Sequence, residues 1–514
     1  MRRFRLLPMF HFNMRLFCSN VAFLPESDAK FQFKHVDLIK EFTGCPIDQV
    51  RKAVSSRLKL QLLSEQEVLS KLEILENLDI YDLRSIGIVP LLLKHPIALN
   101  NYHTALCEYS FVPFLIQSYQ IKRFTSLCRN SVKDLKEKGF IENNAEVMRN
   151  LWRHAELDIS NCPEVSDFQS LHDLKAIAIR AFFKEKLDVS DEDIDRQQSE
   201  INLRLLNKSF KTINSNLKLF RDDIMLSKAR MFLNWYILYA NYENCLQILS
   251  KFPYIGSTEM KVFFHVFPKI SMMTVDNMEK ILNYLEDDGI QISALERFPS
   301  LLTLNSETVK ERLKEVKSIE TLSVYQKHPQ IAKLLLHQVR AKRRLNILQE
   351  LKIFCSLNYL ITTEKQFERI CETQTRVSGC DSMHYLKAEL NLDKSEIATK
   401  LKRHKRWRFV PVVEVAKNLR YLRKIFNEKE IIDNIYILFY YNGRVVQELE
   451  KLEHHENMEA FKCNGHIKKE FILPLTIYFL EKEFNFTGES IWETSIINPY
   501  QDLPDRPEIK VKSL

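Results

Sequence analysis

The chain has 514 residues, of which 45% are hydrophobic and 28% charged, so it can bury a large core and is too long for one simple globular unit. Only 9 glycines are present, which argues against glycine-rich phosphate loops and favours an all-α chain. The net charge of +8 favours an acidic partner without identifying one.

The chain offers little for catalysis, metal binding or membrane insertion. Its 10 cysteines are scattered without any C-x-x-C spacing, so they are interpreted as reduced thiols. The nearest approach to a metal-ligand set is His454, His455, Cys463 and His466, for which a polar loop is a better interpretation than zinc. No run of eighteen apolar residues occurs, so no membrane span is expected. We expect a protein that is not an enzyme and needs no cofactor, because no catalytic constellation stands at motif spacing.

The first 25 residues predict a mitochondrial transit peptide. Apolar side chains alternate there with arginines, and no acid precedes Glu26, which is the amphipathic, acid-free pattern of such peptides. The arginines are Arg2, Arg3, Arg5 and Arg15. Removal is expected between Phe17 and Pro25 and implies the mitochondrial matrix; the alternative is a disordered basic start.

Four regions are expected after this peptide. They are degenerate helical repeats over 36–160, an irregular helical segment over 161–221, the main repeat array over 222–460, and a C-terminal cap and tail over 461–514. The irregular segment contains an acidic run that starts at Asp188. It lacks the glycine of a calcium loop, so a helix capped by Ser190 is the favoured interpretation.

An aromatic residue or histidine followed by proline recurs in the main array. The pairs are Phe267-Pro268, Phe298-Pro299 and His328-Pro329, so the prolines are 31 and 30 residues apart. A period of this size is typical of solenoids whose units cannot bury an apolar face alone. Proline cannot donate to a helix ladder and moves its predecessor out of the α region. Each proline is therefore expected to end a short helix and turn the chain.

The unit between two such prolines has a definite layout. Gly289 stands where the end of a helix needs a left-handed residue, and a short helix over 292–297 follows. After Pro299, either Asn305 or Ser306 is expected to cap a second, longer helix.

The longer helix of each unit carries the same apolar stripe. Residues at i, i+4 and i+7 are apolar in two consecutive units, and Thr274 is the expected cap of the earlier one. The stripes are Val309, Leu313 and Val316 in the later unit and Met278, Leu282 and Leu285 in the earlier one.

Weaker copies of the unit follow toward the C-terminus. Asn391 takes the place of the glycine, a substitution that the left-handed region tolerates. His404-Lys405 then stands where a proline would be expected. A last copy is expected from Asn427 through Tyr441.

The repeat has the order leucine, glycine followed by an apolar residue, short helix, proline, leucine-rich helix. The residues that carry it are Leu285, Gly289, Ile290, Phe298, Pro299, Leu301 and Leu302. This pattern resembles the repeat of the mitochondrial transcription termination factor (mTERF) family, clearly over 230–450 and more faintly over 40–130, and the composition and spacing fit its insect branch.

The resemblance implies both a fold and a ligand. Each repeat would be two α-helices and a short 3₁₀ turn, and the repeats would form a left-handed superhelix. The expected fold class is therefore an all-α helical repeat solenoid. The resemblance also implies a basic concave face that holds double-stranded DNA or, in some branches, ribosomal RNA.

Two dense groups of cations are the candidate nucleic-acid contacts. Lysine and arginine suit phosphate contacts, and no acid lies between Glu396 and Glu414; the alternative interpretation is a solvated helix face. The first group is Arg340, Lys342, Arg343 and Arg344, and the second is Lys400, Lys402, Arg403, Lys405, Arg406, Trp407 and Arg408, extended by Arg420, Arg423 and Lys424. Trp407 could stack on a base, although a buried core position is the simpler expectation.

The most specific hypothesis is a mitochondrial protein that binds double-stranded mitochondrial DNA and regulates or terminates transcription. One alternative is an RNA-binding factor in mitochondrial ribosome assembly or translation. Another is a scaffold that engages a protein partner in the mitochondrial transcription machinery. The sequence hardly separates DNA from RNA, because the same cationic face would serve both.

Overall fold

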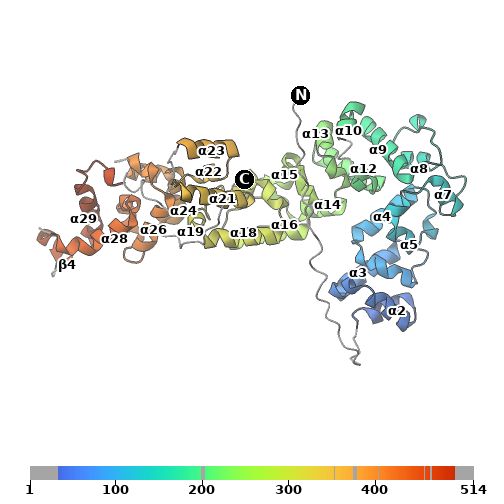
Figure 1. The fold of residues 1–514 in the computed structure, drawn as a ribbon, viewed down its shortest axis with the longest axis horizontal. Coiled ribbons are helices and arrows are strands. Elements are labelled where there is room, and N and C mark those ends of the chain that lie inside the picture. The colour runs from blue at the N-terminus through green and yellow to red at the C-terminus, as the bar shows by residue number, and fades with distance from the viewer. Residues whose placement is uncertain are drawn as a thin grey trace. The chain divides into compact units, whose positions relative to one another are not determined.

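The computed structural model describes residues 33–197, 203–351, 353–373, 379–402, 405–455, 458–463 and 466–491. The predicted transit peptide, Arg403, His404 and the C-terminal tail lie outside the described residues. The ribbon is shown in Figure 1.

The chain divides into two compact units. The first unit comprises the described residues up to Leu151 together with Cys162–Leu174, and the second comprises Trp152–Asn161 and the described residues from Lys175 onward. The chain passes between the units within α8 (Val147–His154) and α9 (Leu171–Leu187). The finer division expected from the sequence stays a prediction.

The first unit is built of short helices. They are α1 (Val36–Thr43), α2 (Ile47–Ser55), η1 (Leu58–Leu62), α3 (Glu65–Asn77), η2 (Ile86–Leu93), α4 (Pro96–Glu108), η3 (Pro113–Leu115), α5 (Ser118–Lys122), α6 (Phe124–Leu127) and α7 (Val132–Glu137).

The second unit begins with an irregular part. It contains η4 (Ile159–Asn161), α10 (Asp191–Gln197), α11 (Leu203–Leu206), α12 (Phe210–Lys218) and the π-helical turn η5 (Leu219–Asp223). The amide of Asp193 donates to the Ser190 hydroxyl at 3.2 Å. The predicted cap of the acidic run is therefore confirmed.

The main array follows in the same unit. Its elements are α13 (Lys228–Leu233), η6 (Trp235–Tyr239), α14 (Tyr242–Lys251), β1 (Tyr254–Ile255), β2 (Thr258–Glu259), α15 (Met260–Val266), η7 (Pro268–Met272), α16 (Val275–Asp287), α17 (Ser293–Arg297), η8 (Pro299–Thr303), α18 (Ser306–Ser318), α19 (Glu320–Ser323), α20 (Ile331–Leu336), α21 (Gln338–Glu350), α22 (Leu357–Leu360), α23 (Glu364–Thr373), α24 (Gly379–Leu390), α25 (Lys394–Lys400), η9 (Lys405–Phe409), α26 (Val412–Leu422), α27 (Glu428–Asp433), η10 (Ile435–Phe439) and α28 (Asn442–Lys451).

The array ends in a small cap. It consists of η11 (Leu452–His454), η12 (Glu459–Phe461), β3 (Lys462–Cys463), β4 (His466–Ile467) and α29 (Lys469–Lys482). The strands of the described chain form two antiparallel pairs, β1 with β2 and β3 with β4, in which Tyr254 faces Glu259 and Lys462 faces Ile467. The predicted all-α helical repeat fold is confirmed.

The repeat unit is a short α-helix, a 3₁₀ helix and a longer α-helix, as in α15–η7–α16 and α17–η8–α18. The residue before the proline leaves the α region in both units, with φ −134° and ψ 76° at Phe267 and φ −134° and ψ 63° at Phe298. A following proline disfavours the α region at its predecessor, and the short helix ends there as predicted. Proline then occupies the first position of the 3₁₀ helix, where no amide donor is needed.

Caps complete the predicted layout. The amide of Asn277 donates to the Thr274 hydroxyl at 3.2 Å, and the amide of Glu307 donates to the Asn305 side chain at 2.9 Å. Gly289 has φ +65° and Asn391 has φ +51°, so both adopt the left-handed conformation expected at these helix ends. The two apolar stripes are buried apart from Leu282, which is partly exposed.

Consecutive repeats are joined by one polar side chain from each long helix. Asn277, the third residue of α16, donates to the Leu304 carbonyl at 2.9 Å and accepts from the Ser306 amide at 2.7 Å. It thereby binds the backbone where the next long helix begins. Asn244, the third residue of α14, makes the same two contacts one repeat earlier.

In other repeats the joining residue is the seventh of its helix. The third and seventh positions lie one turn apart on the same helix face, so both can reach the next repeat. Asn418 of α26 donates to the Leu438 and Tyr440 carbonyls at 3.0 and 2.7 Å. Lys71, Asn216, Arg312 and Arg344 occupy the same helix position and also donate to backbone carbonyls. We call these seven side chains the latch residues.

The proline is not indispensable to the unit. A 3₁₀ helix begins at Lys405 although no proline stands there, whereas His328-Pro329 leads through turns into the α-helix α20. Within the described residues, no helix has the length and apolar character needed to cross a membrane.

Candidate nucleic-acid interface

The first predicted cluster lies on α21, where its four cations have different environments. Arg340 is exposed and donates to the Thr362 carbonyl at 3.3 Å. Lys342 and Arg343 form ion pairs with Glu315 and Glu364 at 2.6 and 2.9 Å. Two of the three accessible cations are thus already paired with acids.

Arg344 has a different role from the one the sequence suggested. Its side chain is 0% exposed, donates to the carbonyls of Leu360 and Thr362 at 2.9 and 2.8 Å, and pairs with Glu364 at 2.8 Å. Its guanidinium also lies 4.5 Å from the centre of the Phe367 ring. A buried guanidinium with these partners cannot meet a phosphate, so the prediction of a nucleic-acid contact at Arg344 is corrected to a latch residue.

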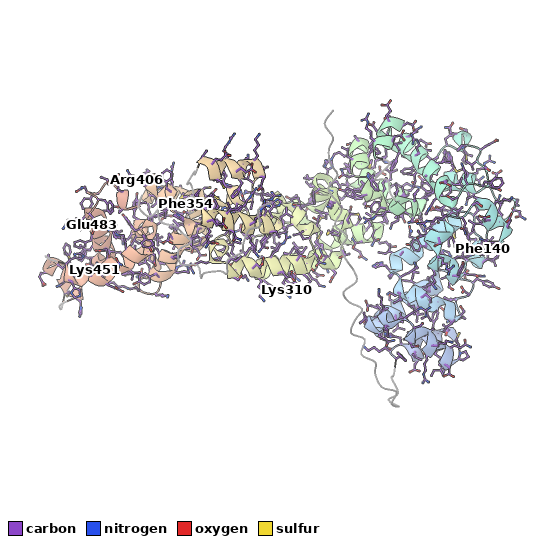
Figure 2. The ribbon with its side chains drawn as sticks, viewed as in Figure 1. Phe140, Lys310, Phe354, Arg406, Lys451 and Glu483 are labelled. Atoms are coloured by element: carbon purple, nitrogen blue, oxygen red, sulfur yellow. The ribbon has the colours of Figure 1, made fainter. Side chains whose placement is uncertain are left out.

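The second predicted cluster surrounds η9. Lys400 is paired with Asp433 at 3.7 Å, and Arg406 is paired with Glu489 at 3.0 Å. Figure 2 labels Arg406. Lys402 is exposed and has no acidic partner among the described residues. Arg403 and the side chain of Lys405 lie outside what the structure describes.

Trp407 belongs to the core. Its side chain is only 7% exposed, and its ring meets the edge of Phe439 with the ring centres 6.0 Å apart. The exposed guanidinium of Arg408 covers it, 5.6 Å from the ring centre. Trp407 is therefore corrected from a candidate base-stacking residue to a packing residue, which the sequence had offered as the simpler expectation.

The predicted extension of this cluster is largely neutralised. Arg420 is paired with Glu320 at 2.8 Å. Arg423 is paired with Glu389 and Glu428 at 2.9 and 2.8 Å, and these partners hold its pKa above the ordinary value against the opposing effect of burial. Lys424 is exposed, and the described residues give it no acidic partner.

The predicted positions that remain available to a ligand are thus a subset. They are exposed and form no ion pair within the described chain; two lie in α21 and η9, and two lie in the segments that follow α25 and α26: Arg340, Arg408, Lys402 and Lys424.

A further group of cations surrounds His337, between α20 and α21. Burial lowers the pKa of His337, and the nearby positive charges of Arg340, Lys333 and Arg312 lower it further. Lys333 also lies 5.8 Å from the centre of the Phe298 ring, so this group reaches the preceding repeat.

The density of cations along the sequence could not reveal this group, because each helix supplies only one or two of its charges. A weaker signal was present: Lys333 and Arg340 are seven residues apart, a spacing that two successive helical turns can bring to one side. However, α20 ends before His337 and α21 begins after it, so the sequence does not predict that Lys333 and Arg340 share one helix face.

Among the described residues, no group of three or more histidine, cysteine or acidic side chains could hold a metal ion. His455 instead stacks on Phe479 with ring centres 3.8 Å apart and bonds to Glu448 at 3.2 Å. Cys463 and His466 face each other across the β3–β4 pair.

The chain is similar to one named protein over most of its length. It is 28% identical over 471 residues to "Transcription termination factor 5, mitochondrial" of Drosophila melanogaster, an alignment that covers 89% of this chain and 83% of that protein. No family model matches the chain, and no solved structure does. The repeat of short helix, 3₁₀ helix and long helix agrees with the similarity. Over most of its length the chain is therefore similar to an insect protein that is named a mitochondrial transcription termination factor.

Proposed function

We propose that this protein binds double-stranded mitochondrial DNA in the matrix and regulates or terminates transcription there, without catalysing a reaction. The observation that carries the proposal is the set of exposed cations that lack acidic partners, Arg340, Lys402, Arg408 and Lys424. Similarity to a Drosophila protein that is named a mitochondrial transcription termination factor supports the same function.

The physical basis is counterion release. Each phosphate that a lysine or arginine neutralises frees condensed cations, so the logarithm of the binding constant falls with the logarithm of salt by about 0.9 per contact on duplex DNA. A helical array held by latch residues would keep such cations at fixed spacing. The cations would therefore meet several phosphates without ordering each side chain separately.

The test compares ligands and variants of the full chain. Binding to duplex DNA and to structured RNA of equal length is measured by fluorescence anisotropy from about 50 to 200 mM salt. The variant Lys402→Glu with Arg408→Glu should weaken duplex binding by about tenfold or more and reduce the salt slope by about 2. The matched control is Lys310→Glu with Lys314→Glu on α18, where both lysines are also exposed.

Two outcomes would count against the proposal. Equal duplex binding by both double variants would show that Lys402 and Arg408 do not contact DNA. A consistent preference for structured RNA would favour the alternative of a factor in ribosome assembly or translation. Mapping the positions that the protein occupies on mitochondrial DNA in cells would then test the proposed role in transcription.

A further inference from the structure

A cavity in the second unit lies outside the predicted clusters. Its volume is about 500 Å³, and it is formed by residues 289–297, the turn 326–331 and the C-terminal end of α24 with the first residue of α25. Segments about a hundred positions apart in the sequence thus line one space. The volume is in the range that accommodates a small organic ligand.

The lining is strongly cationic. Arg297, Lys327, Lys387 and Lys394 all line the cavity. The one carboxylate of the lining, Glu296, is already engaged, since it accepts hydrogen bonds from the Ser257 amide and hydroxyl at 2.6 and 2.8 Å.

Two of the four cations are partly neutralised and two are not. Lys327 is paired with Glu389 at 3.0 Å, and Lys387 lies 3.6 Å from the exposed Asp393. Arg297 and Lys394 are both exposed and have no acidic partner in the described part of the chain. The carboxylates of Glu296, Glu389 and Asp393 offset three of these four cations, so the cavity keeps an excess of one positive charge.

His384, in the wall of the cavity, is affected by the positive charge of these cations. The Lys394 ammonium lies 3.2 Å from His384 Nε2, and since an ammonium can only donate, His384 must accept there and be neutral. Burial lowers the pKa of His384 to about 4, and the charges of Lys394, Arg297 and Lys387 add to this effect.

A second histidine lies against the first. His328 is only 6% exposed, and its ring centre is 4.7 Å from that of His384. Its Nδ1 accepts from the Gln330 amide at 3.1 Å, so Nε2 carries the proton and finds no hydrogen-bond acceptor within the described chain. The wall thus combines two packed histidines with unbalanced positive charge.

We infer that this cavity binds the phosphoryl group of a nucleotide-sized ligand, with Arg297 and Lys394 as its principal contacts. A phosphate monoester or polyphosphate carries the negative charge that Arg297 and Lys394 lack in a partner; an arginine can bind it with two donors, while a lysine supplies a point charge. The phosphoryl group can belong to a free nucleotide or to a nucleotide unit of a bound nucleic acid. The second source rests on the proposed function.

The experiment uses the full chain and probes for both sources. Calorimetric titration with adenosine triphosphate and with inorganic pyrophosphate tests for a free nucleotide. Fluorescence anisotropy with duplex DNA tests for a nucleotide unit of a bound nucleic acid. The variant Arg297→Ala with Lys394→Ala is compared with Lys310→Ala with Lys314→Ala, whose lysines lie on α18 and do not line the cavity. Lys394→Ala alone is a second, milder variant, because Lys394 is exposed.

We expect at least a tenfold loss of affinity in the cavity variant, a smaller loss in Lys394→Ala, and no change in the control. Loss for adenosine triphosphate or pyrophosphate identifies a free ligand; loss for duplex DNA alone identifies a nucleotide unit of nucleic acid. If the folded cavity variant binds every probe as the wild type does, or if the wild type binds none of them, the inference is wrong. Nucleotide binding without duplex binding would contradict only the proposed function, and duplex binding that is insensitive to the cavity variant, without nucleotide binding, would contradict only this inference.

Discussion

The guanidinium of Arg344 donates a hydrogen bond of 2.9 Å to the carbonyl of Leu360. Asn418 has the same relationship to Leu438 at 3.0 Å, and each donor is the seventh residue of its helix. A residue that stands within a basic cluster in the sequence is therefore part of the joint between repeats. Buried carbonyls at these turns require a donor, and arginine and asparagine both supply one.

Replacing Arg344 by alanine should destabilise the fold rather than merely weaken a ligand contact. The change leaves the buried carbonyl of Leu360 without this donor, removes one of the two arginine donors to the Thr362 carbonyl, and removes the packing on Phe367. We expect the free energy of unfolding to fall by about 2–4 kcal/mol, measured by chemical denaturation.

The adjacent Arg343→Ala is the control for that change. Arg343 is exposed and its pairing with Glu364 is solvated, so its loss should cost less than about 1 kcal/mol. Equal effects of the two substitutions would contradict the latch assignment. A folded Arg344→Ala protein of unchanged stability would do so as well.

Asn418→Ala tests the same joint without a charge. Asn418 is fully buried, and its amide serves the carbonyls of both Leu438 and Tyr440. Losing a donor to two buried carbonyls should reduce the free energy of unfolding by about 2–4 kcal/mol. Asn346→Ala, at an exposed position of α21, should change it by less than about 0.5 kcal/mol.

Local patterns predicted the repeat unit well. The prolines, Gly289, Asn391 and the caps each act within a few residues, so their neighbours in the sequence suffice to interpret them. The irregular part could not be predicted in the same way. The π-helical turn at Leu219–Asp223 has no such local signal, and the α-helix α20 follows Pro329 although 3₁₀ helices follow the prolines of the two preceding units.

The candidate site was harder to predict because charge density does not say which side of a helix is covered. On α21 the buried positions include Ala341, Arg344, Leu345 and Leu348, the i, i+3, i+4 and i+7 spacing of a core-facing stripe. That periodicity placed Arg344 inside the core. The acidic partners of Arg406 and Arg420, in contrast, are 83 and 100 residues away in sequence, and only the structure brings them together.

Trp407→Leu should separate packing from stacking. Leucine keeps an apolar side chain against Phe439 but offers no ring to a base, so we expect nucleic-acid affinity within about twofold of the wild type. The free energy of unfolding should fall by about 1–3 kcal/mol, because the smaller side chain leaves a cavity. A stable, folded variant that lost nucleic-acid binding would show that the ring does contact the ligand.

Asp381 makes the stability of the second unit depend on pH. Burial raises its pKa from near 3.8 to about 6, against the hydrogen bonds that it accepts from the Leu357 amide at 2.7 Å and from the Tyr325 side chain. His328 does not compensate, since its Nε2 is 3.8 Å away and burial lowers its pKa to about 3. The protonated carboxyl is therefore favoured in the fold: its contribution is fully present below about pH 3.8 and is lost as the pH rises through 6.

Asp381→Asn should abolish the loss of stability that occurs as the pH rises through 6. The amide oxygen can still accept from Leu357, and no charge is buried at position 381, which is 1% exposed. At pH 8 we expect the variant to be more stable than the wild type by an amount on the order of 1–3 kcal/mol. The difference should shrink at pH 5, where most of the wild-type carboxyl is protonated. Denaturation at the two pH values measures the difference, and a variant less stable at pH 8 would mean that the hydrogen bonds to the ionised carboxylate outweigh the cost of burying its charge.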